Sequence, residues 1–207
     1  MRKLILIYPL LLVVIGMSAQ GKMSAEEAAA LRAKVKKQSE ATRTISSDFT
    51  QFKHLDFLSN DIESKGKLAF KAPDLVKWEY VKPFAYSILF KNQTLYTNDD
   101  GHKSNMDLGG NNIFKQLNKL ITSSIRGDMF DDGEFDITYF NKEVGSLVRF
   151  MPKDAQLSTF IKAFEIGFNA QGEVEEVKMI EPSDDYTMII FSNRIQNQNL
   201  SDEVFSQ

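Results

Sequence analysis

The residues that could perform catalysis or hold a metal are few and poorly spaced. The chain has two histidines and no cysteine, and neither His54 nor His102 belongs to an H-x-x-x-H pair of the kind that zinc sites use. The acidic run from Asp128 to Glu134 lacks the alternating spacing of a calcium loop. The nucleophile-elbow and phosphate-loop patterns are absent. We therefore expect no catalytic residue, no metal and no cofactor, and we predict that the protein is not an enzyme.

The overall composition narrows the function classes further. The 207 residues are 43% hydrophobic and 26% charged, with 25 Lys and Arg against 28 Asp and Glu, as in an ordinary globular protein. A net charge of −3 without a basic cluster argues against nucleic-acid binding. The absence of cysteine excludes disulfides and a lipidated N-terminal Cys. The unusual feature is the presence of 16 phenylalanines beside a single tryptophan.

The N-terminal segment has the layout of an export signal. Arg2 and Lys3 precede an apolar run over residues 4–15, and small residues follow up to Ala19. A run of roughly 12 apolar residues is shorter than the ~20 that a membrane-spanning helix needs. We therefore predict a cleaved signal peptide over residues 1–19 and a single domain over residues 20–207.

Two helices are predicted in the remaining chain. Ser24 and Glu27 form a capping box at the start of a helix over residues 24–44, whose apolar stripe is thin. That stripe consists of Ala28, Leu31 and Val35. A second helix begins after Asn111 or Asn112 and ends at Gly127. Its apolar residues form a good amphipathic stripe and are Ile113, Phe114, Leu117, Leu120, Ile121 and Ile125.

The period of hydrophobicity changes to two after residue 47, which is typical of β-strands. Turn residues separate the alternating segments about every 10 residues, as in an antiparallel meander. We predict strands near residues 47–58, 65–72, 76–80, 84–90, 94–97, 135–140, 145–151, 159–168, 173–181 and 185–192. The fold class is mainly β (α+β), with about ten strands that curl into a barrel or a deep half-barrel.

One face of the predicted sheet collects large apolar side chains. Its members are Leu68, Phe70, Val76, Trp78, Tyr80, Phe84, Tyr86, Ile88 and Phe90. A packed core explains any one of them, but two helices, one with a thin stripe, cover the whole face only loosely. Sites for apolar ligands are concave and apolar. We therefore predict a cavity on this face that can hold an acyl chain.

An ordered set of motifs resembles the LolA family of outer-membrane lipoprotein carriers. The set is Phe49-Thr50-Gln51, the segment from Gly66 through Pro73 and Trp78 to Tyr80, Pro83, and Asn92-Gln93-Thr94-Leu95-Tyr96. The resemblance implies an unclosed antiparallel half-barrel with helices that form a lid over an apolar cavity. It places Val76 and Trp78 on the cavity wall, and Leu31 or Val35 on the lid. We extend the lid to Ile113, Phe114 and Leu117 of the second helix.

The resemblance also implies a function. It indicates a soluble periplasmic chaperone, which we expect to be a monomer, that binds triacylated lipoproteins. The partners would be an inner-membrane ABC transporter that releases the cargo and an outer-membrane acceptor that receives it. Two alternatives are a carrier of another envelope lipid or hydrophobic biosynthetic product, and an interaction or sensor domain that uses the half-barrel for protein docking.

Two positions depart from the family pattern. Ala72 stands where well-studied members have an Arg that latches the lid by hydrogen bonds, and Lys77 stands where an Arg often precedes the Trp. Because Ala72 offers no side-chain donor, we expect the first helix to be held mainly by apolar contact.

Overall fold

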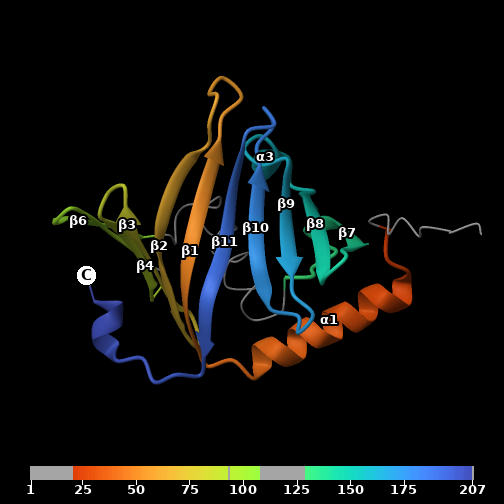
Figure 1. The fold of residues 1–207 in the computed structure, drawn as a ribbon, viewed down its shortest axis with the longest axis horizontal. Coiled ribbons are helices and arrows are strands. Elements are labelled where there is room, and N and C mark those ends of the chain that lie inside the picture. The colour runs from red at the N-terminus through yellow and green to blue at the C-terminus, as the bar shows by residue number, and fades with distance from the viewer. Residues whose placement is uncertain (1–20, 93, 108–128, 207) are drawn as a thin grey trace, which may run out of the picture.

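A single antiparallel sheet forms the body of the protein (Figure 1). The computed structural model describes residues 21–92, 94–107 and 129–206. Within them the sheet has eleven strands in the order β6-β5-β4-β3-β2-β1-β11-β10-β9-β8-β7. The strands are β1 (Thr44–His54), β2 (Ile62–Lys71), β3 (Leu75–Lys82), β4 (Tyr86–Lys91), β5 (Thr94–Asp99), β6 (His102–Asp107), β7 (Phe135–Asn141), β8 (Ser146–Pro152), β9 (Ala163–Phe168), β10 (Val174–Ile180) and β11 (Tyr186–Gln196).

Two meanders meet at the centre of this sheet. In each of them, strands that follow one another in the chain are neighbours, and β1 pairs with β11 where the two meanders join. The outermost strands, β6 and β7, lie at opposite edges, so the sheet of the described residues remains open. This arrangement confirms the predicted unclosed antiparallel half-barrel.

The eleventh strand, β6, carries no hydrophobic alternation that would predict it. All six of its residues are exposed. It forms because Asp100 and Gly101 adopt positive φ angles of 46° and 94°, the conformation of a two-residue hairpin turn, and so direct the chain back along β5.

Several predicted boundaries were wrong. The first strand begins and ends a few residues earlier than predicted, because residues 55–58 form a turn. The strand predicted from residue 159 begins only at Ala163, because Asp154 caps the short helix α3 (Ala155–Ser158) just before it. Phe84 lies in the bend between β3 and β4 rather than in a strand.

The first predicted helix is confirmed as α1 (Ala25–Glu40), although it ends at Glu40 rather than at residue 44 because β1 begins there. Ser24 caps it with the complete capping box, and its buried residues are the predicted Ala28, Leu31 and Val35. The second predicted helix, with Ile113, Phe114 and Leu117, lies outside the described residues. No helix in the described part of the chain combines the length and apolarity needed to cross a membrane.

Strand register places apolar side chains on one face across the whole sheet. Val76 lies opposite Phe70 on β2 and Phe90 on β4. Across the central seam, Phe49 of β1 lies opposite Phe191 of β11. Because directly opposite residues share a face, these side chains form one continuous apolar surface.

Helix α1 covers only one half of this face. In Figure 1 it runs below β10, β9 and β8 toward the β7 side of the sheet, and its apolar stripe joins a buried cluster with β7, β8 and β9. A second buried cluster lies on β1, β2 and β3 and consists of Ile45, Phe49, Leu68, Phe70 and Val76.

The outer face of β2 and β3 is partly covered by the C-terminal segment, which contains the short helix η2 (Asp202–Phe205) packed against β3. Lys71 Nζ lies 2.7 Å from Asp202 Oδ1, and Lys77 Nζ donates to the Ser206 carbonyl oxygen at 3.2 Å. Lys71 and Lys77 therefore lie on the outer face and bind this segment.

Candidate functional site

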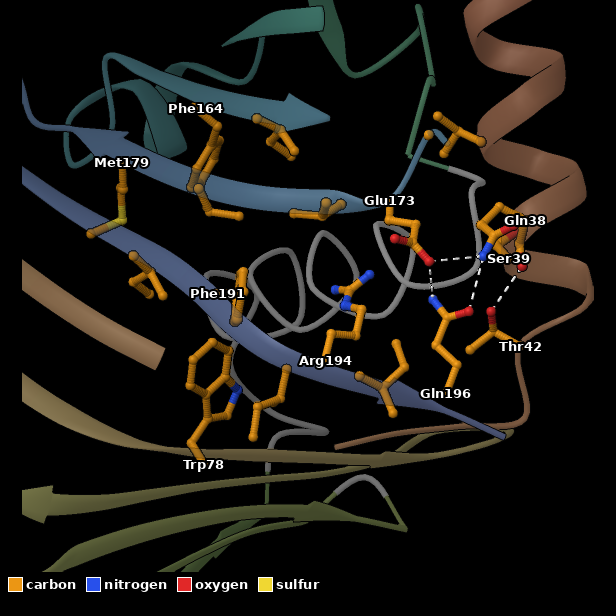
Figure 2. A pocket seen from close by; sticks show the side chains of 18 of the residues that line it. Gln38, Ser39, Thr42, Trp78, Phe164, Glu173, Met179, Phe191, Arg194 and Gln196 are labelled. Atoms are coloured by element: carbon orange, nitrogen blue, oxygen red, sulfur yellow. Dashed lines mark hydrogen bonds between the residues drawn. The ribbon is translucent and has the colours of Figure 1, made fainter. Parts of the chain in front are cut away.

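A pocket of about 210 Å³ lies between the last turns of α1 and the seam where the two halves of the sheet meet. Figure 2 shows that its lining has two parts. The apolar part includes Trp78, Phe164, Met179 and Phe191. The polar part lies under the end of α1 and consists of Gln38, Ser39, Thr42, Glu173, Arg194 and Gln196.

The apolar part is organised around the single tryptophan. The Trp78 ring lies 5.0 Å from the Phe49 ring, edge to face, and 5.8 Å from the Phe191 ring. Phe49 itself packs on Gly66 so closely that a Cβ atom there would come within 2.5 Å of the Phe49 ring. Gly66 is therefore required for the position of Phe49, and through it for that of Trp78.

The polar part contains a hydrogen-bond network that joins α1 to the sheet. Gln38 Nε2 donates to Glu173 Oε1 at 3.1 Å and to Gln196 Oε1 at 2.9 Å. Gln196 Nε2 donates to the same Glu173 oxygen at 2.8 Å, and Asn169 Nδ2 donates to Glu173 Oε2 at 2.8 Å. We call Gln38, Glu173 and Gln196 the amide–carboxylate clasp.

The clasp corrects the prediction that α1 is held mainly by apolar contact. Three further bonds hold the helix. Lys34 Nζ donates to the Ala170 carbonyl oxygen at 3.1 Å, Arg32 Nη1 donates to the Tyr139 hydroxyl at 3.2 Å, and Asn141 Nδ2 donates to Glu27 Oε1 at 3.3 Å. Although Ala72 offers no side-chain donor, α1 still makes polar contacts to β11, β7 and the turn before β10.

An irregularity in β11 directs two polar side chains into the pocket. Between Ser192 and Ile195 the strand gains one residue relative to β1, and Asn193 has a φ of 51°. Such a bulge changes which residues point inward. Arg194 and Gln196 consequently line the pocket, whereas Ile195 is 53% exposed.

Arg194 is the only cationic side chain of the described lining. Burial lowers the pKa of its guanidinium, and the negative charge of Glu173 opposes that shift. Among the described residues, Arg194 has no hydrogen bond or ion pair. In Figure 2 its guanidinium lies between the clasp and the aromatic side chains.

The predicted cavity residues fall into three groups. Leu68 and Trp78 line the pocket, together with Val35 of the predicted lid. Phe70 and Val76 are buried in the neighbouring cluster, with Tyr80 and Phe90 packed against it, and Leu31 is buried with β7 to β9. Tyr86 and Ile88 are half-buried farther along the same face, whereas Phe84 is 75% exposed.

The polar pocket residues were missed by sequence reasoning. Glu173 and Gln38 are common residues at unremarkable positions in a turn and a helix. Strict alternation along β11 would have placed Ile195, not Arg194, inward. Asn193 is the only available signal, because Asn tolerates a positive φ and so suits a bulge.

The two histidines make ordinary structural contacts. His54 Nδ1 lies 2.8 Å from Asp61 Oδ1, and its ring stacks on Tyr186 with centroids 4.7 Å apart. His102 Nδ1 lies 3.2 Å from the Asp99 carbonyl oxygen, in the turn before β6.

Comparison with known proteins gives one family match. The family model described as "Outer membrane lipoprotein carrier protein LolA" matches residues 40–207. No curated protein sequence matches the chain.

Several solved structures are similar. MucB is 10% identical with a TM-score of 0.53, over 89% of this chain and 64% of MucB. A LolA superfamily protein from Nitrosomonas europaea is 8% identical with a TM-score of 0.47, over 87% and 97% of the two chains. The lipoprotein LppX from Mycobacterium tuberculosis is 8% identical with a TM-score of 0.45, over 84% and 98%. The likeness to MucB shows a shared fold.

Proposed function

Because this chain belongs to the LolA family of outer membrane lipoprotein carriers, we propose that it carries the acyl chains of lipoproteins in the pocket beneath α1. The carrier is residues 20–207, exported to the periplasm after removal of residues 1–19. It takes triacylated lipoproteins from an inner-membrane ABC transporter and delivers them to an outer-membrane acceptor.

The observation that carries this proposal is the apolar part of the pocket. Trp78, Phe191 and Met179 come from three different strands and leave a space between them. Close-packed interiors contain few spaces larger than a water molecule. A cavity of about 210 Å³ walled by these side chains therefore suits a hydrocarbon chain rather than a polar metabolite.

The size of the pocket also bears on release. Pockets for drug-sized ligands enclose roughly 300–1,000 Å³, so the present cavity is too small for three acyl chains. Loading several chains requires α1 to move outward. Each buried methylene stabilises the complex by roughly 0.8 kcal/mol. A pocket that buries only part of the acyl surface therefore binds the cargo weakly enough to release it to the next protein.

Binding can be followed with the protein's own fluorescence. Trp78 is the only tryptophan and lies in the pocket wall. Titration with a triacylated lipopeptide should shift or quench its emission, while the same peptide without acyl chains should leave the emission unchanged. Phe191→Glu should abolish the response, because a carboxylate facing acyl chains is costly to desolvate.

The matched control is Phe160→Glu, which introduces the same charge at a phenylalanine that is 54% exposed and outside the pocket. It should bind like the wild type. If the wild type gives equal responses to the acylated and unacylated peptides, the proposal is wrong. As a second test, mass spectrometry of protein purified from its native source should identify acylated peptide as the bound material.

A further inference from the structure

The pocket contains a positive charge, which the binding of a hydrocarbon chain does not require. Eleven of its lining residues are aliphatic or aromatic, or are methionine, yet Arg194 directs a guanidinium into the same space. A guanidinium stays protonated in proteins. Placing it in an apolar wall is costly unless a negative group compensates it.

No group in the described structure fully compensates this charge. Glu173 is the only carboxylate in the lining, and it makes no ion pair with Arg194 among the described residues. Its oxygens already accept three hydrogen bonds from the amides of Gln38, Gln196 and Asn169. The five N–H donors of Arg194 therefore face the pocket without an acceptor from the described residues.

The position of Arg194 divides the pocket into a polar and an apolar end. Figure 2 shows the clasp on one side of the guanidinium, and Phe164, Met179, Phe191 and Trp78 on the other. A ligand that extends from Arg194 over these apolar side chains has one charged end and one hydrocarbon end. The β11 bulge is what directs Arg194 inward, so this polarity is built into the backbone.

We propose that Arg194 binds the anionic head group, carboxylate or phosphate, of an acyl lipid whose chain lies between Trp78, Phe191 and Met179. A guanidinium fork matches both anions with two parallel hydrogen bonds. Glu173 does not exclude the anion, because three amide hydrogen bonds already stabilise the negative charge of its carboxylate. The inference rests on the acyl-binding part of the proposed function and adds a second class of ligand, because the acylated cysteine of a triacylated lipoprotein carries no carboxylate or phosphate.

A fluorescent fatty acid and its methyl ester test the proposal. The probes are cis-parinaric acid and methyl parinarate, titrated at a pH well above the pKa of a carboxylate. The wild type should bind the acid at least tenfold more tightly than the ester. Arg194→Met should remove this preference by weakening acid binding, with ester binding unchanged.

Two variants control for the fold and for charge in general. Arg43→Met removes an exposed arginine near the end of α1 that does not line the pocket, and it should retain the preference for the acid. Arg194→Lys keeps the charge without the fork and should keep part of the preference. Arg194→Met should unfold at a temperature no lower than the wild type, because it removes a poorly compensated charge from an apolar wall.

Competition distinguishes carboxylate from phosphate head groups. Palmitate and 1-palmitoyl-lysophosphatidate should both displace parinaric acid from the wild type, and the stronger competitor identifies the head group. Equal binding of acid and ester by the wild type, or a preference that survives in Arg194→Met, would overturn the role of Arg194 and leave the proposed function intact. If the wild type binds neither probe nor the triacylated peptide, the proposed function itself fails.

Discussion

Both halves of the sheet alternate apolar and polar residues, but the apolar side chains of the two halves differ in how completely they are buried. On β8 and β9, Val148, Phe150, Ile166 and Phe168 are at most 1% exposed, and α1 packs over their half. On β3 and β4, Trp78, Tyr80, Ile88 and Phe90 remain half-buried. The pocket lies where these halves meet. If the proposed function is right, we expect the α1 half to contribute mainly stability and the seam to contribute binding.

The largest expected effect is on the stability of the α1 half. Phe150→Ala should lower the free energy of unfolding by about 3–5 kcal/mol, because the ring is fully buried against Phe130 and Phe135. Urea denaturation followed by circular dichroism measures this loss. Lipid binding extrapolated to the folded fraction should not change. A loss of intrinsic affinity as large as that of a pocket variant would contradict the assignment of stability to the α1 half and binding to the seam.

The next effect concerns the seam. Phe191→Ala should weaken lipopeptide binding about tenfold, which corresponds to about 1.4 kcal/mol, and should destabilise the fold less than Phe150→Ala. The reason is that Phe191 is half-buried at the pocket wall, beside Trp78. Titration monitored by Trp78 fluorescence gives the affinity, and urea denaturation of the same sample gives the stability. The reverse order of stability losses would contradict the comparison.

A smaller effect should appear at the clasp. Gln38→Leu removes two donated hydrogen bonds at nearly constant volume, and it should cost about 1 kcal/mol. Amide exchange in the last two turns of α1 should become faster, while exchange in β8 and β9 stays the same. Lys36→Gln, at an exposed position on the same helix, serves as the control. Unchanged exchange in Gln38→Leu would show that the clasp does not hold the end of α1.

The smallest effect is a pH dependence at the start of α1. Hydrogen bonds from the backbone and side chain of Ser24, and from Asn141, lower the pKa of the Glu27 carboxyl. Ionised Glu27 therefore stabilises the fold above its unfolded pKa, and this contribution is lost as the pH falls through the folded pKa. Glu27→Gln should flatten the acid side of a plot of stability against pH. Glu26→Gln, which removes the same charge from the same turn, serves as the control.

Sequence reasoning identified the elements with a regular hydrophobic period and missed the places where that period is absent or interrupted. Alternation identified ten strands, and the capping box identified α1, because both are periodic or local signals. It failed at β6, which is polar throughout and forms through its hairpin turn. It also failed at the β11 bulge, where one extra residue reverses the inward positions and brings in Arg194.

Local sequence patterns cannot show which apolar residues of one face line the cavity and which are buried in the core. Val76 and Trp78 share a face and a strand, yet Val76 is fully buried in a core cluster while Trp78 lines the pocket. The difference arises from what packs against each side chain. Ile189 and Phe191 of β11, which pack against the cluster that buries Val76, come from a distant part of the chain. Glu173 and Gln38 likewise meet across 135 residues of sequence.

The pairing of β1 with β11 has a consequence for how the chain acquires its structure. Ser47 donates a hydrogen bond to the Ser192 carbonyl oxygen, 145 residues away, in the middle of the sheet. Closing so long a loop costs entropy before any contact compensates it, and high contact order slows folding. The seam, and with it the pocket, can form only after β11 has left the ribosome. A chain shortened before residue 186 therefore loses the strand that joins its two meanders, rather than a peripheral tail.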